Sequence, residues 1–367
     1  MLEASSRMWN EDMVVARTSK ILRLCLVSRY FTTTYGEGVG IGRVSQSLAE
    51  GLRRQKEVVV STVATKGRGL YSYFIYSAME VPLQLPPWYS IDVFHGLTPI
   101  EAIWLPKPIS VVTYHDLFQI TNPQLVGGGM GYESWKLLIG KSYFECACRI
   151  AKNCKRIVCV SDKTADEVNT ILKVKANKIR IIESGISEEL EPQGKKDDKI
   201  RIGYIGMLDK RKRISKVIEA MKKMPEVDCE FVIGGGGIDA DKLQQEAEGD
   251  KRIKFIGYVA EEYMKDFYNN LDVFVFPTAI EGYGLPIVEA MACKKPVVVL
   301  EDAIIPQQLK KRCVVVKDYA EILTQVDKGE EVSREEDRES NYIFAKEHKW
   351  GKAIDKYMRV YQEVVYG

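Results

Sequence analysis

The chain has 367 residues, 46% of them hydrophobic and 28% charged, with 53 Lys and Arg against 51 Asp and Glu and a pI near 8.0. A compact domain usually holds roughly 100–200 residues, so this length predicts two domains. The near-balance of charge argues against a nucleic-acid-binding protein, and the hydrophobic content argues against disorder.

No apolar run reaches the roughly 20 residues that cross a bilayer. The amino-terminal segment is charged where a secretory signal would be apolar, so we expect a cytoplasmic protein. The 8 cysteines form no CxxC pair and lie mostly in apolar runs, which favours free thiols. Cys146, Cys148, Cys154 and Cys159 lack a zinc-knuckle spacing, and the chain has only 3 histidines, so no metal site is expected.

Residues 1–19 show no periodicity and are predicted to be an extension. Short apolar runs then alternate with amphipathic helical stretches, which is typical of βαβ units and parallel sheets. Strands are predicted at 21–28, 57–62, 91–95, 109–114, 156–160 and 179–182. Helices are predicted at 43–54, 132–152 and 162–172.

The alternation breaks at residues 188–199, where charged residues surround Pro192 and Gly194. We therefore place a linker at 191–199, an amino-terminal domain at 20–190 and a second domain at 200–345. Strands of the second domain are predicted at 201–205, 229–233, 253–255, 273–276, 296–300 and 313–316. Its helices are predicted at 214–224, 240–248, 261–269 and 285–293. The expected fold class is α/β, with two Rossmann-like, doubly wound parallel sheets that bind ligands at the carboxyl ends of their strands.

The most informative loop is residues 277–292, where a buried strand leads into a glycine-bearing loop and a helix. Pro286 fits the first turn of that helix, and the free N–H groups of Gly284 and Leu285 would face an anion. Glu281 and Glu289 can point into one pocket, because helical side chains lean toward the amino terminus. A carboxylate beside a phosphate needs neutral donors, so sugar hydroxyls are the expected partners of both.

Two further loops have features suited to phosphate binding. Gly206 ends a predicted strand and is followed by the basic run 210–213, of which Arg211 and Lys212 could neutralise a diphosphate as a leaving group gains charge. Residues 36–43, with Gly40 and Gly42, let a substrate approach the backbone. Their glycine spacing is not G-x-G-x-x-G, which argues against a nicotinamide dinucleotide.

His95 and His115 each end a predicted strand, so both are candidates for the cleft, although either could be a core histidine. Asp239 and Asp241 resemble a metal-holding DxD, but capping of the following helix is the preferred interpretation.

These segments together resemble the retaining glycosyltransferase family 4, whose members have the GT-B fold. Residues 281–298 are similar to the family's E-x7-E signature, 204–212 to its YVGxLxPRKN segment and 256–259 to its nucleobase turn F-x-G-x-V. His115-Asp116-Leu117 matches its HDL and residues 40–43 its GGIGR loop. The segment 346–367 includes Trp350 and a final helix after it, which in such enzymes crosses back to the amino-terminal domain.

The resemblance implies a hexosyltransferase that uses a UDP- or GDP-sugar and transfers with retention by a front-face mechanism, without a metal or other cofactor. Glu281, His115, Arg211 and Lys212 would act in catalysis. Glu281 would contact the donor sugar and Glu289 its ribose. Donor binding would also involve Gly284, Leu285, Gly206, Tyr258, Val259, Gly40 and Gly42. His95 and Asp116 would lie on the acceptor side.

Three departures from the family pattern concern donor binding and the hinge. Met207 stands where many members carry an arginine, residues 183–187 replace the usual PNGVD, and Lys294-Lys295 replaces a glycine-bearing turn. A nucleotide-sugar-binding partner subunit without activity, or a GT-B sugar-nucleotide epimerase, are the alternative functions.

The acceptor is expected to be a carbohydrate or a lipid-linked carbohydrate, bound by loops at 68–88 and 124–135 that match no pattern we can interpret. The first loop carries aromatic residues and lies alongside Arg53, Arg54 and Lys56, which together could contact an anionic membrane surface. Packing of these aromatics into the core is the other interpretation.

Overall fold

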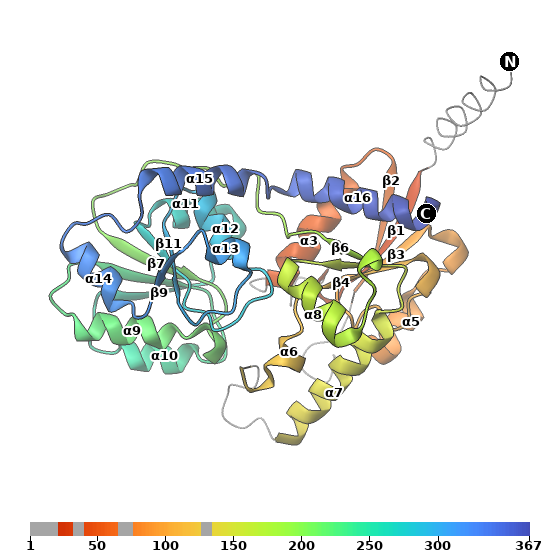
Figure 1. Ribbon diagram of the computed structural model, residues 1–367, viewed down its shortest axis with the longest axis horizontal. Helices are drawn as coiled ribbons and strands as arrows, with labels where there is room; N and C mark the ends of the chain where they lie inside the picture. Colours follow the sequence, from red (N-terminus) through yellow and green to blue (C-terminus); the bar gives the residue numbers. More distant parts are fainter. Residues whose placement is uncertain (1–20, 32–39, 65–75, 126–133) are drawn as a thin grey trace, which may run out of the picture.

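The computed structural model describes residues 21–31, 40–64, 76–125 and 134–367 of the chain. The predicted extension and parts of the loops at 36–43, 68–88 and 124–135 lie outside these ranges. Two lobes lie side by side, each built on one sheet flanked by helices (Figure 1).

The amino-terminal sheet has six parallel strands in the order β2-β1-β3-β4-β5-β6. The strands are β1 Leu22–Val27, β2 Val58–Val63, β3 Val93–Gly96, β4 Ser110–Tyr114, β5 Arg156–Cys159 and β6 Ile179–Ile181. The helices that follow in this lobe are α3 Gly40–Arg53, α5 Val81–Gln84, α6 Phe118–Thr121, α7 Ser134–Ala151 and α8 Asp162–Leu172. One face of the sheet packs against α3, and the other against α5, α7 and α8.

The carboxyl-terminal sheet has six parallel strands in the order β12-β11-β10-β7-β8-β9. The strands are β7 Arg201–Ile205, β8 Glu230–Gly234, β9 Ile253–Gly257, β10 Val273–Val275, β11 Val297–Leu300 and β12 Val314–Val316. The helices are α9 Ile214–Lys223, α10 Ala240–Ala247, α11 Met264–Asn269, α12 Leu285–Ala292, α13 Gln307–Lys310, α14 Ala320–Asp327 and α15 Glu335–Lys346. The predicted fold class, two doubly wound parallel sheets, is confirmed.

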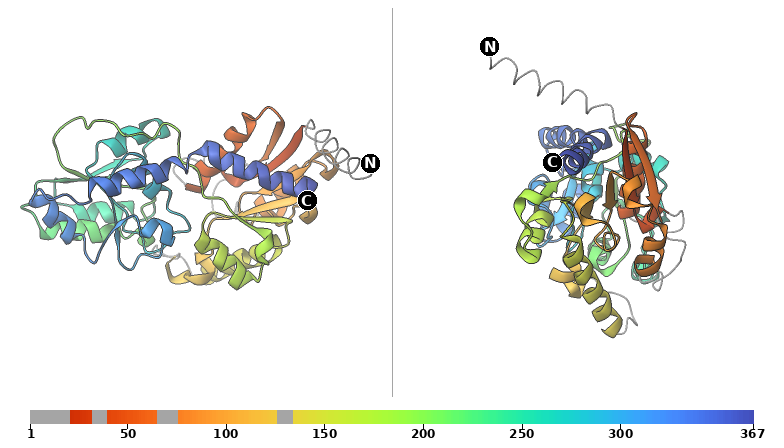
Figure 2. Two further views of the ribbon diagram at one scale, coloured as in Figure 1. Left: turned by 45° about the horizontal axis from the view of Figure 1, so that its top comes forward. Right: turned by 90° about the vertical axis from the view of Figure 1, so that its right-hand side faces the viewer.

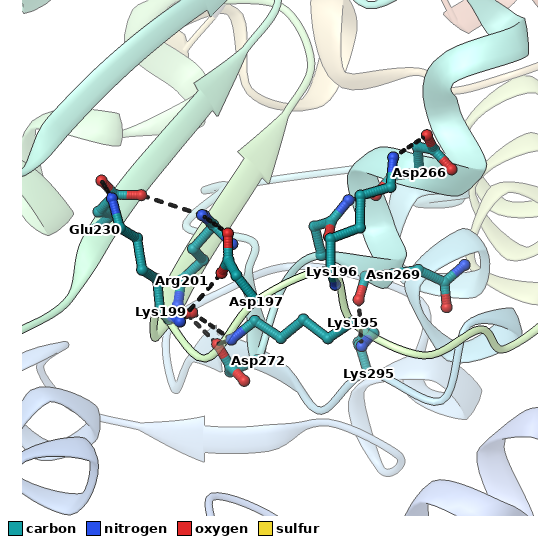
Figure 3. A network of polar contacts seen from close by, with 11 residues as sticks. Lys195, Lys196, Asp197, Lys199, Arg201, Glu230, Asp266, Asn269, Asp272 and Lys295 are labelled. Atoms are coloured by element: carbon teal, nitrogen blue, oxygen red, sulfur yellow. Dashed lines mark hydrogen bonds and ion pairs between the residues drawn. The ribbon is translucent and has the colours of Figure 1, made fainter.

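The segment between the sheets is fastened to the carboxyl-terminal domain by ion pairs (Figure 3). Lys195 pairs with Asp272 at 2.7 Å and Lys196 with Asp266 at 2.6 Å, while Asp197 binds Arg201 at 2.7 Å. Although its composition is typical of a solvated linker, this segment is therefore part of the carboxyl-terminal domain surface.

The chain crosses between the domains twice, and the two crossings pair with each other. Ile186 donates its N–H to the His348 carbonyl at 2.9 Å, and Trp350 donates its N–H to the Ile186 carbonyl at 3.2 Å. Gly185 has no room for a side chain, because a Cβ there would lie 2.5 Å from the Trp350 ring. These paired crossings form the hinge.

Helix α16, Trp350–Tyr366, leaves the hinge and runs across the amino-terminal domain (Figure 2). Its buried face adds Ile354, Tyr357, Tyr361 and Val364 to the core on the α3 side of the sheet. The last segment of the chain thus completes the first domain.

Candidate functional site

The loop that follows β10 carries the first glutamate of the E-x7-E pair to the edge between the domains. Gly284, at φ +107°, makes the turn into α12, and Pro286 stands in the first turn of this helix. Glycine suits this left-handed backbone conformation, because it has no Cβ that would clash with the carbonyl oxygen. Glu281 precedes this turn and Glu289 lies one turn inside the helix, so both side chains come from one local structure.

Three donors converge on one carboxylate oxygen of Glu281. Arg211 donates to Oε1 at 2.5 Å and the Thr278 hydroxyl at 2.9 Å, and the Lys212 ammonium also contacts this oxygen. Burial alone would raise the pKa of Glu281, but Lys212 and Arg211 lower it to about 2. Glu281 is therefore a carboxylate at neutral pH, and both predicted diphosphate cations lie beside it.

The glycine loops after β7 and β8 pack directly against each other. A Cβ on Gly235 would lie 1.9 Å from the Gly206 carbonyl oxygen, and Gly206 donates its N–H to the Gly234 carbonyl at 3.1 Å. The two glycine loops therefore pack backbone against backbone, without intervening side chains.

His115 and Asp116 follow β4 and reach the same place from the amino-terminal domain. The Nε2 of His115 donates to the Leu97 carbonyl at 3.0 Å, which leaves Nδ1 as an acceptor. Burial lowers the pKa of His115 to about 4, so the ring is neutral. Burial raises the pKa of Asp116 to about 7, even though Arg211 is close enough to lower it.

The acceptor-side prediction for His95 is wrong. His95 is 1% exposed, and its ring nitrogens lie 2.9 Å from the Tyr361 hydroxyl and 2.8 Å from the Thr113 hydroxyl. Both ring nitrogens are thus engaged inside the protein, and α16 covers the ring. His95 joins this helix to the sheet and cannot reach an acceptor in this structure.

Glu289 is 1% exposed, and both of its oxygens are engaged. Tyr268 donates to Oε2 at 2.8 Å, and Arg43, from α3 of the other domain, donates to Oε1 at 2.7 Å. Arg43 also forms a two-point ion pair with Glu261, at 2.7 and 3.1 Å. Sequence reasoning placed Arg43 in the GGIGR loop but gave it no role.

Three more contacts join the Glu281 loop and Arg211 to the amino-terminal domain. A Cβ on Gly282 would lie 1.9 Å from the His115 carbonyl oxygen, so the two loops touch backbone to backbone. Ser161, the N-cap of α8, donates its hydroxyl to the Gly282 carbonyl at 2.6 Å. The Arg211 guanidinium lies over the Phe118 ring, 5.3 Å from its centre.

A further buried acid, which the sequence did not single out, lies just beyond β3. Glu101 is 1% exposed, and its Oε1 accepts the Arg29 N–H at 2.8 Å. Among the described residues, its Oε2 has no hydrogen-bond partner. Burial raises the pKa of Glu101 to about 7, against the effect of the Arg29 N–H. The sequence signal that could have identified Glu101 is its position in an apolar run that follows a predicted strand.

The remaining predicted residues have less distinctive surroundings. Tyr258 is 55% exposed on the loop after β9, and the next residue, Val259, packs against the carboxyl-terminal core. Gly40 begins α3 and Gly42 is buried within it. Asp239 stands at the N-cap of α10, but its side chain makes no capping hydrogen bond.

Among the described residues, no group of three or more His, Cys, Asp or Glu is arranged to hold a metal ion. None of the helices described is long and apolar enough to cross a membrane.

Two family models match adjoining parts of the chain. Residues 39–190 match "Glycosyltransferase Family 4" and residues 186–351 match "Glycosyl transferases group 1". The chain therefore belongs to this glycosyltransferase family, and it has the GT-B fold.

Individual relatives and structures agree with this assignment. The chain is 27% identical over 230 residues to the O-antigen chain mannosyltransferase B of Escherichia coli, a match that covers 57% of each protein. It spans roughly half of the length of the first curated relatives it matches. Sucrose-phosphate synthase from Thermosynechococcus elongatus is similar in fold, with a TM-score of 0.69 at 17% identity over 94% of this chain and 99% of that one. Anabaena HepE, solved with UDP and glucose, gives a TM-score of 0.68 at 15% identity over 93% of this chain and 100% of that one.

Proposed function

We propose that this protein is a retaining hexosyltransferase that moves a hexose from a UDP- or GDP-sugar to a hydroxyl of a carbohydrate or lipid-linked acceptor. The observation that carries the proposal is the position of Glu281 between Arg211 and Lys212, facing the His115 loop. The HepE structure, which holds UDP and glucose in the same fold, supports a nucleotide-sugar donor.

The charges around Glu281 suit a sugar diphosphate. The ionised carboxylate can accept hydrogen bonds from sugar hydroxyls, which are neutral donors. Arg211 and Lys212 would bind the diphosphate and become most useful as it leaves with added negative charge. These two cations could do this without a metal, so we propose metal-independent transfer.

Retention follows in this proposal from substitution on one face of the sugar. The bond from the anomeric carbon to the phosphate oxygen breaks, the bond to the acceptor oxygen forms on the same face, and the acceptor proton passes to the leaving phosphate. No protein nucleophile is required. His115, neutral and with Nδ1 available as an acceptor, would orient a donor-sugar hydroxyl from the opposite domain.

On the membrane, we propose contact through the edge of the amino-terminal sheet where its strands begin. Trp88 and Tyr89, 69% and 71% exposed, directly precede β3, and exposed Arg54 and Lys56 directly precede β2. In a parallel sheet the segments that precede the strands lie at the same end of the sheet, opposite to the carboxyl ends of the strands, from which His115 reaches the site. Such contact would hold the protein on the cytoplasmic membrane surface and leave the cleft open.

The donor proposal is tested by thermal unfolding with UDP, GDP, ADP and their common sugar conjugates, with and without EDTA. A ligand at 100 times its dissociation constant adds about 2.7 kcal/mol of stability. We expect one base to stabilise the protein equally in both conditions. No stabilisation by any of them would contradict a nucleotide-sugar donor site. Binding of a nucleotide sugar without turnover on any acceptor would favour the inactive partner subunit, for which Met207 in place of an arginine is the specific observation.

Flotation with anionic vesicles at low salt tests the membrane proposal. The wild-type protein is expected to float with the vesicles, and the Trp88→Ser/Tyr89→Ser variant to remain at the bottom. Wild type that stays with the unbound fraction contradicts the proposal.

A further inference from the structure

Arg43 connects the two domains at the second glutamate of the E-x7-E pair. Its Nη2 donates to Glu289 at 2.7 Å and to Glu261 at 3.1 Å, and its Nε donates to Glu261 at 2.7 Å. One guanidinium from α3 is thus held by two carboxylates of the carboxyl-terminal domain. Its side chain is only 27% exposed, so solvent screens the pair incompletely.

The surroundings leave no place for another ligand on Glu289. Its Oε2 is taken by the Tyr268 hydroxyl, its Oε1 by Arg43, and the side chain is 1% exposed. A small cavity around this pair is lined from both domains, by Ser47 and Trp350 as well as by Glu261 and Leu285. A ribose could therefore reach Glu289 only after the guanidinium has moved.

We propose that Arg43 occupies the ribose position of the donor site and that nucleoside binding exchanges it for ribose hydroxyls. This inference rests on the proposed function and on the family resemblance, which implies that Glu289 contacts the ribose of the donor. Arg43 is then a residue that sets donor affinity and couples binding of the nucleoside to release of an ion pair between the domains.

The exchange predicts a specific pattern of affinities. When only a fraction of the protein molecules can bind a ligand, the apparent dissociation constant equals the intrinsic dissociation constant divided by that fraction. If Arg43 fills the site in nine of ten molecules, its removal strengthens nucleoside binding about tenfold. A nucleoside diphosphate brings anionic groups that can pair with the released guanidinium, so the same removal should help the diphosphate less.

The experiment is isothermal titration of wild type and Arg43→Met with the nucleoside and the diphosphate of the preferred base, chosen among uridine, guanosine and adenosine. Arg53→Met is the matched control, since Arg53 is exposed at the end of the same helix. We expect Arg43→Met to bind the nucleoside about tenfold more tightly and the diphosphate with a smaller gain, while Arg53→Met equals wild type. Thermal unfolding shows that each variant is folded.

The possible failures are distinguishable. Unchanged or weaker nucleoside binding in folded Arg43→Met, with wild type still binding the diphosphate, overturns the exchange. Glu289→Gln should lose nucleoside affinity in either background. If neither the nucleoside nor the diphosphate binds to any of these proteins, the proposed function itself fails.

Discussion

On the carboxyl-terminal side of the domain interface, Glu281, whose side chain is 15% exposed, is surrounded by Arg211, Lys212 and Thr278, and its pKa falls to about 2. On the amino-terminal side, Asp116 at the interface and Glu101 inside the same domain lack comparable compensation, and burial raises the pKa of each to about 7. The carboxyl-terminal side therefore holds a fixed negative charge next to cations. The amino-terminal side holds acids that are close to changing protonation near neutral pH.

The largest effect is expected from removing the negative charge of Glu281. We expect Glu281→Gln to lower turnover about 10²–10³-fold, because a hydrogen bond made to the donor sugar near the transition state is lost. Nucleotide affinity should stay within a few-fold of wild type, since Arg211 and Lys212 remain. Steady-state kinetics and titration with the diphosphate measure the two quantities.

Exposed Glu301→Gln is the matched control for Glu281→Gln and should equal wild type. Unchanged turnover in Glu281→Gln would remove the central site assignment. Thermal unfolding of the same samples reports whether the unpaired cations destabilise the fold.

A smaller loss is expected from separating the two sides at Gly282. A Cβ there would lie 1.9 Å from the His115 carbonyl oxygen, so Gly282→Ala should keep the loops apart and lower turnover about tenfold or more. Gly194→Ala is the control, because a Cβ at Gly194 meets no atom within 4 Å. Wild-type turnover in Gly282→Ala would show that this contact is dispensable for catalysis.

The difference in pKa between the two sides predicts opposite effects of pH on stability. The folded protein binds the Asp116 proton more tightly than the unfolded chain does, because burial raises this pKa from 3.8 to about 7. Asp116 should therefore lower the melting temperature as pH rises from about 4 to about 7. Glu281 has the opposite effect, because its pKa is lowered from 4.5 to about 2. Its contribution to the stability of the fold should be lost as pH falls from about 4.5 to about 2.

Melting temperatures of wild type and Asp116→Asn between pH 4 and pH 8 test the first part. The fall should be shallower in Asp116→Asn and shallower still when Glu101→Gln is added. Parallel profiles for all three proteins would show that these acids are not perturbed by burial.

The smallest effect distinguishes two buried tyrosines near the glutamates. The Tyr283 hydroxyl has no hydrogen-bond partner among the described residues, whereas Tyr268 donates to Glu289 at 2.8 Å. Tyr283→Phe should raise the unfolding free energy by about 1 kcal/mol, and Tyr268→Phe should lower it by about 1–2 kcal/mol. Denaturant unfolding of the two variants side by side measures the difference, and equal effects would contradict the assigned contacts.

The amino-acid sequence by itself determined the secondary structure of both domains. Each predicted strand coincides with an observed one to within two residues at either end, because buried parallel strands are short apolar runs bounded by turns. It did not predict the four-residue helices α5, α6 and α13, nor α14 and α15. The segment of α15 is rich in charge, which hides its apolar periodicity. The sequence also identified Glu281, Glu289, Arg211 and Lys212, since strand, glycines, proline and helix occur together in it.

Tertiary structure alone decided which residues face each other. His95 and His115 both follow apolar runs, but α16, more than 260 residues further along the chain, covers His95 and leaves His115 at the cleft. The pairing of Arg43 with Glu289 joins residues 246 positions apart in different domains. Local periodicity reports only which face of an element is apolar, so contacts that depend on how two domains and a returning helix pack could not be predicted from it.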